Sequence, residues 1–131
     1  MRRICSTILL SIAAATASVA QTYDYRLEDS IRRDRALFDK VRIDLDHASR
    51  YPYASRADVE RFDLARRDLF DFASRFDEGR YERHELDKAI GRLERVVEHN
   101  SLDPRDRGNL SDDLRRMKDF REFHDHHGDW R

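Results

Sequence analysis

The stretch SRADVERFDLARRDLFDFASRFDEG, residues 55–79, contains the start, the apolar face and the stop of one helix. Ser55 and Asp58 are spaced as in a relative of the capping box, where each side chain accepts a hydrogen bond from the other residue's backbone. Gly79 suits a helix end because glycine adopts the left-handed conformation there without strain. Between these signals, apolar side chains recur at heptad-like steps: Val59, Phe62, Leu69, Ala73 and Phe76, with Phe70 and Phe72 widening the face.

A helix of similar length is predicted before this stretch, from about Asp24 to Ser49. It ends at residues 51–53, Tyr-Pro-Tyr, because proline cannot continue the helical hydrogen-bond ladder. Steps of three, four and seven place its apolar residues on one stripe. These residues are Leu27, Ile31, Phe38, Val41, Leu45 and Ala48.

Two more helices are predicted after Gly79. One runs from about Arg80 to His99, with Leu86, Ile90, Leu93 and Val97 facing inward. The other follows Asp103-Pro104, a suitable cap and first helical position. Gly108 weakens its start, so we expect the regular helix only from about Asn109. Its inward residues are Leu110, Leu114, Met117, Phe120 and Phe123.

Four helices joined by short loops favour antiparallel neighbours. We therefore predict an all-α fold, an antiparallel up-down-up-down four-helix bundle formed by a single domain over residues 21–131. The alternative is a three-helix bundle with a loosely attached fourth helix.

The N-terminal segment has the pattern of a cleavable secretory signal, which we assign to residues 1–20. A positive start, Met-Arg-Arg, precedes an apolar stretch over residues 4–12, and small residues Ser-Val-Ala occupy positions 18–20. The apolar part is shorter than the ~20 residues that a membrane-spanning helix needs. We expect Gln21 to begin a periplasmic or secreted product with no membrane span.

Cleavage changes the composition of the product. Cys5 is the only cysteine of the chain and leaves with the signal, which excludes disulfides, thiolate metal sites and a cysteine nucleophile. Loss of Arg2 and Arg3 reduces 26 basic residues to 24 against 27 acidic ones, a formal charge near −3. This balance argues against nucleic acid as a partner, because nucleic-acid binders carry a basic excess.

The candidate metal ligands are His124, His126 and His127, together with His84. The first three lie in the segment 124–131, rich in histidine and aspartate, and neutral imidazole is the commonest protein metal ligand. In an antiparallel bundle the start of the third helix meets the end of the fourth, which brings His84, with Glu82 or Glu85, toward the cluster. Such ligands suit zinc, copper or nickel. The alternative is a flexible tail over residues 124–131 whose histidines have no fixed partner.

Asp34 and Arg66 fall on predicted apolar stripes, although charged residues are seldom buried without a partner. Their positions are about two turns apart, too far for a direct pair. We expect each to form a structural pair with a residue on the third or fourth helix; the alternative is a position at a partly open seam.

The sequence contains no local pairing of a nucleophile with a base and no glycine-rich phosphate loop. We therefore predict a non-enzymatic binding or structural module of the cell envelope, without a cofactor, whose partner is a protein or another envelope component. Pairing of two copies into a homodimer is left open. The alternative function is metal binding or buffering by the C-terminal histidines.

Overall fold

The structure, a computed structural model, describes residues 16–127, with side chains from residue 28 onward. Most of the predicted signal, the Leu27 side chain and the end of the predicted tail, residues 128–131, lie outside the described residues. The chain divides into two units, residues 1–32 and 33–131. In the first unit, residues 16–32 belong to helix α1 (Thr16–Ala48) and the side chains of Glu28, Asp29 and Arg32 are exposed.

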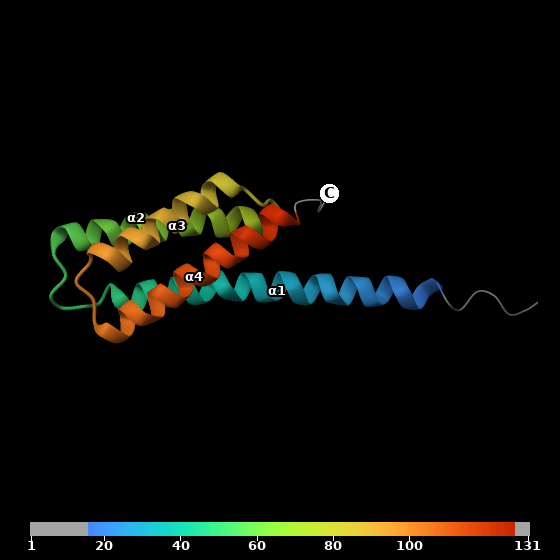
Figure 1. Ribbon diagram of the computed structural model, residues 1–131, viewed down its shortest axis with the longest axis horizontal. Coiled ribbons are helices and arrows are strands. Elements are labelled where there is room, and N and C mark those ends of the chain that lie inside the picture. The colour runs from blue at the N-terminus through green and yellow to red at the C-terminus, as the bar shows by residue number, and fades with distance from the viewer. Residues whose placement is uncertain (1–15, 128–131) are drawn as a thin grey trace, which may run out of the picture. The chain divides into compact units, whose positions relative to one another are not determined.

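The second unit is an antiparallel four-helix bundle (Figure 1). It consists of α1 from residue 33 onward, α2 (Arg56–Asp77), α3 (Arg83–His99) and α4 (Pro104–His126). The fourth helix is part of the core, since Leu110, Met117 and Phe120 of α4 are buried. The all-helical prediction is therefore confirmed in its four-helix form. Within the described residues, no helix has the length and apolar character required to cross a bilayer.

The start and stop signals of α2 act as predicted. The Ser55 hydroxyl accepts a hydrogen bond from the backbone of Asp58, and the Asp58 carboxylate accepts one from the backbone of Ser55. This reciprocal pair satisfies two backbone groups that helical bonding leaves open. At the other end, Gly79 has a φ of 80°, in the left-handed region that glycine adopts at least cost.

Two helix starts differ from the prediction. The third helix begins at Arg83, not Arg80, because residues 80–82 form the connection after the Gly79 turn. The fourth begins at Pro104, not Asn109, and Gly108 lies within it. Asp103 caps the helix by accepting a hydrogen bond from the backbone of Arg105 at 2.8 Å, and Pro104 has a fixed φ that suits the first helical position. These two features outweigh the low helix propensity of Gly108.

Aromatic rings from three helices meet in the core. Phe38 of α1 lies 5.0 Å, centroid to centroid, from both Phe72 of α2 and Phe120 of α4, in edge-to-face geometry. Phe76 completes the group at 5.5 Å from Phe120. Edge-to-face pairs at such distances add to the stabilisation that burial provides. The predicted stripes thus supply the centre of the bundle.

Three apolar residues expected to face inward are instead substantially exposed: Val59 at 48%, Phe70 at 66% and Phe123 at 48%. Successive residues of a helix are rotated by about 100°. The buried positions next to Val59 and Phe70 belong to Asp58 and Leu69, so both side chains are turned toward the surface. The sequence pattern thus overestimated the width of the apolar face, and at Val59 an aspartate, Asp58, takes the buried position instead.

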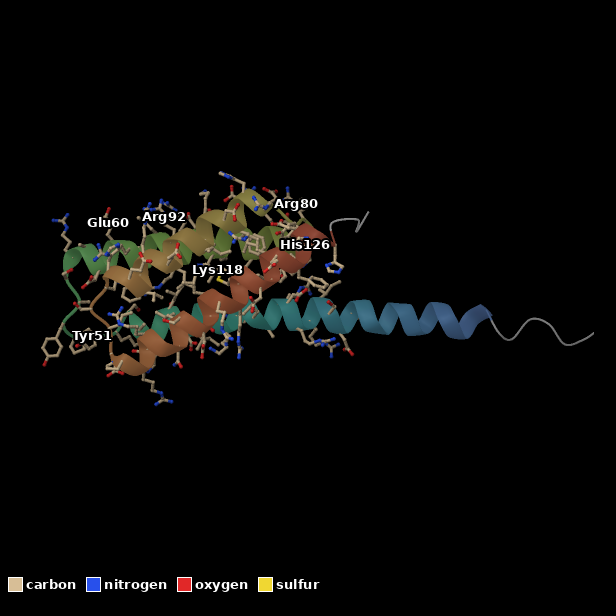
Figure 2. All side chains as sticks on the ribbon, in the orientation of Figure 1. Tyr51, Glu60, Arg80, Arg92, Lys118 and His126 are labelled. Carbon is tan, nitrogen blue, oxygen red and sulfur yellow. The ribbon has the colours of Figure 1, made fainter. Side chains whose placement is uncertain are left out.

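Ion pairs connect each helix of the bundle to its neighbours. At least one pair bridges each of the four interfaces, for example Arg66–Asp46 between α2 and α1, Arg92–Asp68 between α3 and α2, Lys118–Glu94 between α4 and α3, and Lys40–Asp113 between α1 and α4. Figure 2 shows the polar ends of the side chains along the outer faces of the helices, with Tyr51 and Arg80 at opposite ends of the bundle.

Replacement of Ser55 by alanine should lower the free energy of unfolding by about 1–2 kcal/mol, because the hydroxyl that caps α2 is lost and the backbone N–H of buried Asp58 loses its hydrogen-bond acceptor. Urea denaturation measures this difference. Ser101→Ala, in the exposed connection before α4, is the control and should change the midpoint little. Equal effects of the two substitutions would show that the capping box does not stabilise the bundle.

Candidate functional site

The candidate metal residue His124 is a packing residue of the α4 end. Its ring stacks on Tyr81 at 4.7 Å and lies 4.3 Å from Phe120, and its side chain is only 16% exposed. Its Nε2 atom lies 4.0 Å from the Asp34 carboxylate of α1. The imidazole ring is therefore enclosed by aromatic neighbours, and its buried Nε2 atom has no hydrogen-bond partner among the described residues.

Burial dominates the titration of this pair. It lowers the pKa of His124 from its ordinary value, although the carboxylates of Asp34 and Asp125 act in the opposite direction. Burial likewise raises the pKa of Asp34, against the influence of His124 and Arg33. Both shifts favour the neutral forms, as expected for titratable groups removed from water.

The other candidate ligands do not join His124. His127 stacks on Phe123 at 4.4 Å, exposed His126 lies 3.9 Å from Glu122, and His84 is exposed on the first turn of α3. The start of α3 does meet the end of α4, but Arg83 makes the contact, through an ion pair with Asp125 at 2.9 Å. Within the described part of the chain, no group of three histidine, cysteine or acidic residues is arranged to hold a metal ion.

Of the two charges on the apolar stripes, Arg66 has a structural ion-pair partner as we expected. Asp34 faces His124 of α4 at 4.0 Å, without a hydrogen bond to its Nε2 atom. Arg66 lies 3.1 Å from Asp46 of α1 and 3.3 Å from Asp63 of its own helix. The partner of Arg66 therefore comes from α1 and α2, not from the third or fourth helix.

Four buried aspartates were not predicted from the sequence: Asp58, Asp68, Asp106 and Asp113. Each has a basic partner, namely Arg61, Arg92, His47 and Lys40 respectively. Three of the four pairs join residues of different helices. Sequence periodicity indicates only which positions are apolar. The partners in these three pairs are 24, 59 and 73 positions apart in the chain, so the sequence could not show that they would meet.

The most enclosed of these groups is Asp113, whose side chain is 0% exposed. Lys40 donates to Asp113 at 2.8 Å and to Asp44 at 2.5 Å, so one ammonium group lies between two carboxylates. Burial, and secondarily the bond with Asp44, raises the pKa of Asp113 to about 6, with Lys40 opposing the rise. The buried carboxylate links α4 to α1 through Lys40, and the lysine offsets part of the cost of its burial.

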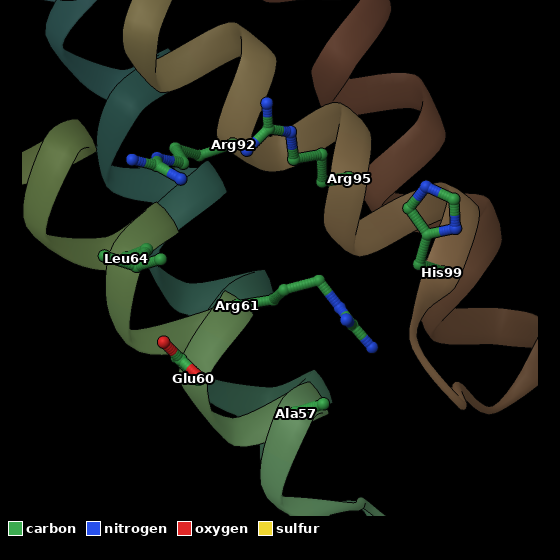
Figure 3. A pocket seen from close by; sticks show the side chains of 7 residues that line it. All are labelled: Ala57, Glu60, Arg61, Leu64, Arg92, Arg95 and His99. Carbon is green, nitrogen blue, oxygen red and sulfur yellow. The ribbon is translucent and has the colours of Figure 1, made fainter.

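A groove of about 290 Å³ lies between α2 and α3, on a face that the sequence analysis did not single out. Figure 3 shows Arg61 extending from α2 toward His99, with Arg92 and Arg95 on the facing helix. Ala57, Leu64 and Glu60 complete its lining. The spacing of Arg92, Arg95 and His99 by three and four residues was a visible signal of one helix face, but the opposing Arg61 required knowledge of the helix pairing.

Comparisons with protein-family profiles, with curated proteins and with solved structures found no match to this chain.

Replacement of Lys40 by methionine should destabilise the protein by about 1–3 kcal/mol at pH 8, because buried Asp113 is left ionised beside Asp44 without its cation. At pH 5, below the pKa of about 6 for Asp113, the loss should be smaller. Chemical denaturation at the two pH values measures both effects. Lys88→Met removes an exposed lysine paired with Glu85 and is the control. A loss that does not change with pH would contradict the role assigned to Asp113.

The buried side chain of His124 should make the stability of the protein depend on pH. Its folded-state pKa is lowered, so its stabilising contribution is complete above the unfolded value of about 6.5 and is lost as the pH falls through the folded-state pKa. His124→Phe retains an aromatic ring and removes the titration. The unfolding free energy of the wild type, relative to this variant, should therefore decrease between pH 8 and pH 5.

The control for this measurement is His126→Gln, which removes an exposed histidine. Its stability should follow that of the wild type across the same pH range. Parallel curves for the wild type and His124→Phe would show that His124 titrates as it does in the unfolded chain.

Proposed function

We propose that the exported chain is a non-enzymatic binding module of the cell envelope that contacts its partner through the groove between α2 and α3. The observation that carries this proposal is the groove itself, a recess lined by three arginines and a histidine from two adjacent helices. Arginine is favoured at recognition surfaces because its planar group offers several hydrogen-bond donors at fixed angles.

The roles of the buried charges also support a binding function over catalysis. Asp58 belongs to the α2 capping box, Asp68 and Asp113 each form an ion pair with a neighbouring helix, and Asp106 lies 2.8 Å from the His47 ring of α1. These carboxylates have structural tasks. The groove is formed by long, solvent-accessible side chains, which suit reversible contact.

The envelope location rests on the sequence of residues 1–20, whose charged start, apolar centre and small-residue end are typical of a secretory signal. The partner is then a molecule met after export. A formal charge near −3 for the exported product makes a locally basic recess a distinctive feature of its surface.

A photo-reactive amino acid introduced at Leu64 tests whether this face contacts a partner in cells. Leu64 lines the groove, so irradiation should yield a discrete cross-linked product in the envelope fraction. A second substitution in the same protein, Arg95→Glu, should reduce the product roughly tenfold or more, since a reversed charge at a contact costs more than 1.4 kcal/mol.

The matched control places the same photo-reactive group at Arg116, an exposed position of α4. Little or no discrete product is expected from it. If both positions react equally, or if Arg95→Glu leaves the Leu64 product unchanged, the proposed face is wrong. Mass spectrometry of the recovered protein should also show Gln21 as its first residue, and an uncleaved chain would contradict the proposed export.

A further inference from the structure

The groove between α2 and α3 has two kinds of cation. Arg61 and Arg92 are held by residues beneath them: Arg61 donates to Asn100 at 2.5 Å and to Asp58 at 2.8 Å, and Arg92 donates to Asp68 at 3.0 Å. Their guanidinium groups are fixed in position, and their charges are partly compensated by the buried carboxylates. Fixed donors bind a ligand with less loss of side-chain entropy than mobile ones.

Arg95 differs from both of these residues. It lines the same groove and is exposed, and it makes no hydrogen bond or ion pair with any residue from 28 to 127. Other exposed arginines, Arg116 among them, likewise have no partner among these residues, but Arg95 is the one that lines the groove. A guanidinium group without a partner, next to two fixed ones, supplies an uncompensated positive charge at this recess.

The lining also limits what can bind. Ala57 and Leu64 offer a small apolar surface, and the volume of about 290 Å³ is at the lower end for small-molecule pockets. The planar fork of arginine matches the oxygen atoms of phosphate and carboxylate groups. Several arginines around one recess favour phosphate, because the oxygen atoms of a doubly charged phosphate can accept hydrogen bonds from more than one guanidinium group.

We propose that the α2–α3 groove binds a phosphomonoester, a phosphate esterified to a short organic group, with Arg95 as the principal contact. This inference rests on the proposed function, because it names the ligand class of the same face. The phosphoryl group can belong to a free small molecule or to the end of an envelope polymer, since the chemistry of recognition is the same.

Glu60 provides an internal test of the charge argument. It is the one carboxylate among the seven lining residues, and Figure 3 shows it on the α2 side of the groove. The negative charge of Glu60 repels an anion in the groove, so a substitution that removes this charge strengthens the binding of an anionic ligand. The same substitution would not strengthen an apolar contact.

The experiment is an NMR titration of the exported protein at constant ionic strength with inorganic phosphate, glycerol 3-phosphate and glutarate. Glycerol 3-phosphate should shift the signals of Arg95 and of its neighbours in α2 and α3. Arg95→Gln should weaken this binding roughly tenfold, and Glu60→Gln should tighten it. Arg116→Gln, which removes an exposed arginine of α4, should leave the affinity unchanged.

The three probes separate the outcomes. A higher affinity for glycerol 3-phosphate than for inorganic phosphate supports an esterified phosphate as the ligand. Equal affinities overturn the requirement for the organic group of the ester. Glutarate binding as tightly as glycerol 3-phosphate overturns the phosphate assignment. Equal losses in Arg95→Gln and Arg116→Gln overturn the site, because they reveal a response to overall charge alone.

Failure of this inference is distinguishable from failure of the proposed function. A cross-link from Leu64 that depends on Arg95, without phosphate binding, would leave the face as a partner surface and reject its phosphate specificity. For an envelope polymer as the source, vesicles carrying a terminal phosphomonoester lipid should retain the wild-type protein and release it on addition of glycerol 3-phosphate. Retention by neutral vesicles as well would reject this source.

Discussion

Asp68 and Asp113 lie almost entirely out of solvent, at 1% and 0% exposure, within α2 and α4. Removing a carboxylate from water costs several kcal/mol unless a cation and hydrogen bonds compensate for the loss. Here the cation comes from the next helix: Arg92 of α3 for Asp68 and Lys40 of α1 for Asp113. Apolar packing alone tolerates a helix sliding by a turn, but these pairs do not. The buried aspartates therefore constrain which helices are neighbours and how they are aligned along the bundle.

The same constraint shapes the surface between α2 and α3. Arg61 and Arg92 lie there because Asp58 and Asp68 are buried beneath them, so much of the basic lining of the groove follows from the internal packing. Arg95 does not follow from it, since no buried carboxylate among residues 28–127 pairs with it. Internal packing thus accounts for the positions of the Arg61 and Arg92 guanidinium groups but not for that of Arg95.

The sequence predicted those parts of the fold that depend on neighbouring residues. Ser55 with Asp58, and Gly79, are local signals, and they mark the ends of α2 as expected. The position of the groove could not be predicted in the same way, because the facing of α2 on α3 depends on contacts between residues far apart in the chain. The placement of the candidate metal ligands was beyond sequence reasoning for a related reason. A histidine such as His124 can serve as a ligand or as an aromatic packing residue, and only its neighbours distinguish the two roles.

In a chain with 40% charged residues, neither the number of charges nor the net charge identifies a binding surface. The negative net charge argued against nucleic acid as a partner, but it says nothing about a recess of about 290 Å³ in which basic side chains outnumber the single carboxylate. The more useful criterion for a binding surface is whether each charged side chain already has an ion-pair or hydrogen-bond partner within the protein. An ion pair between exposed side chains contributes little to stability, and an exposed arginine without a partner contributes less still. Arg95 therefore adds little to the stability of the bundle, and its place beside Arg61 and Arg92 is the feature on which the proposed anion binding rests.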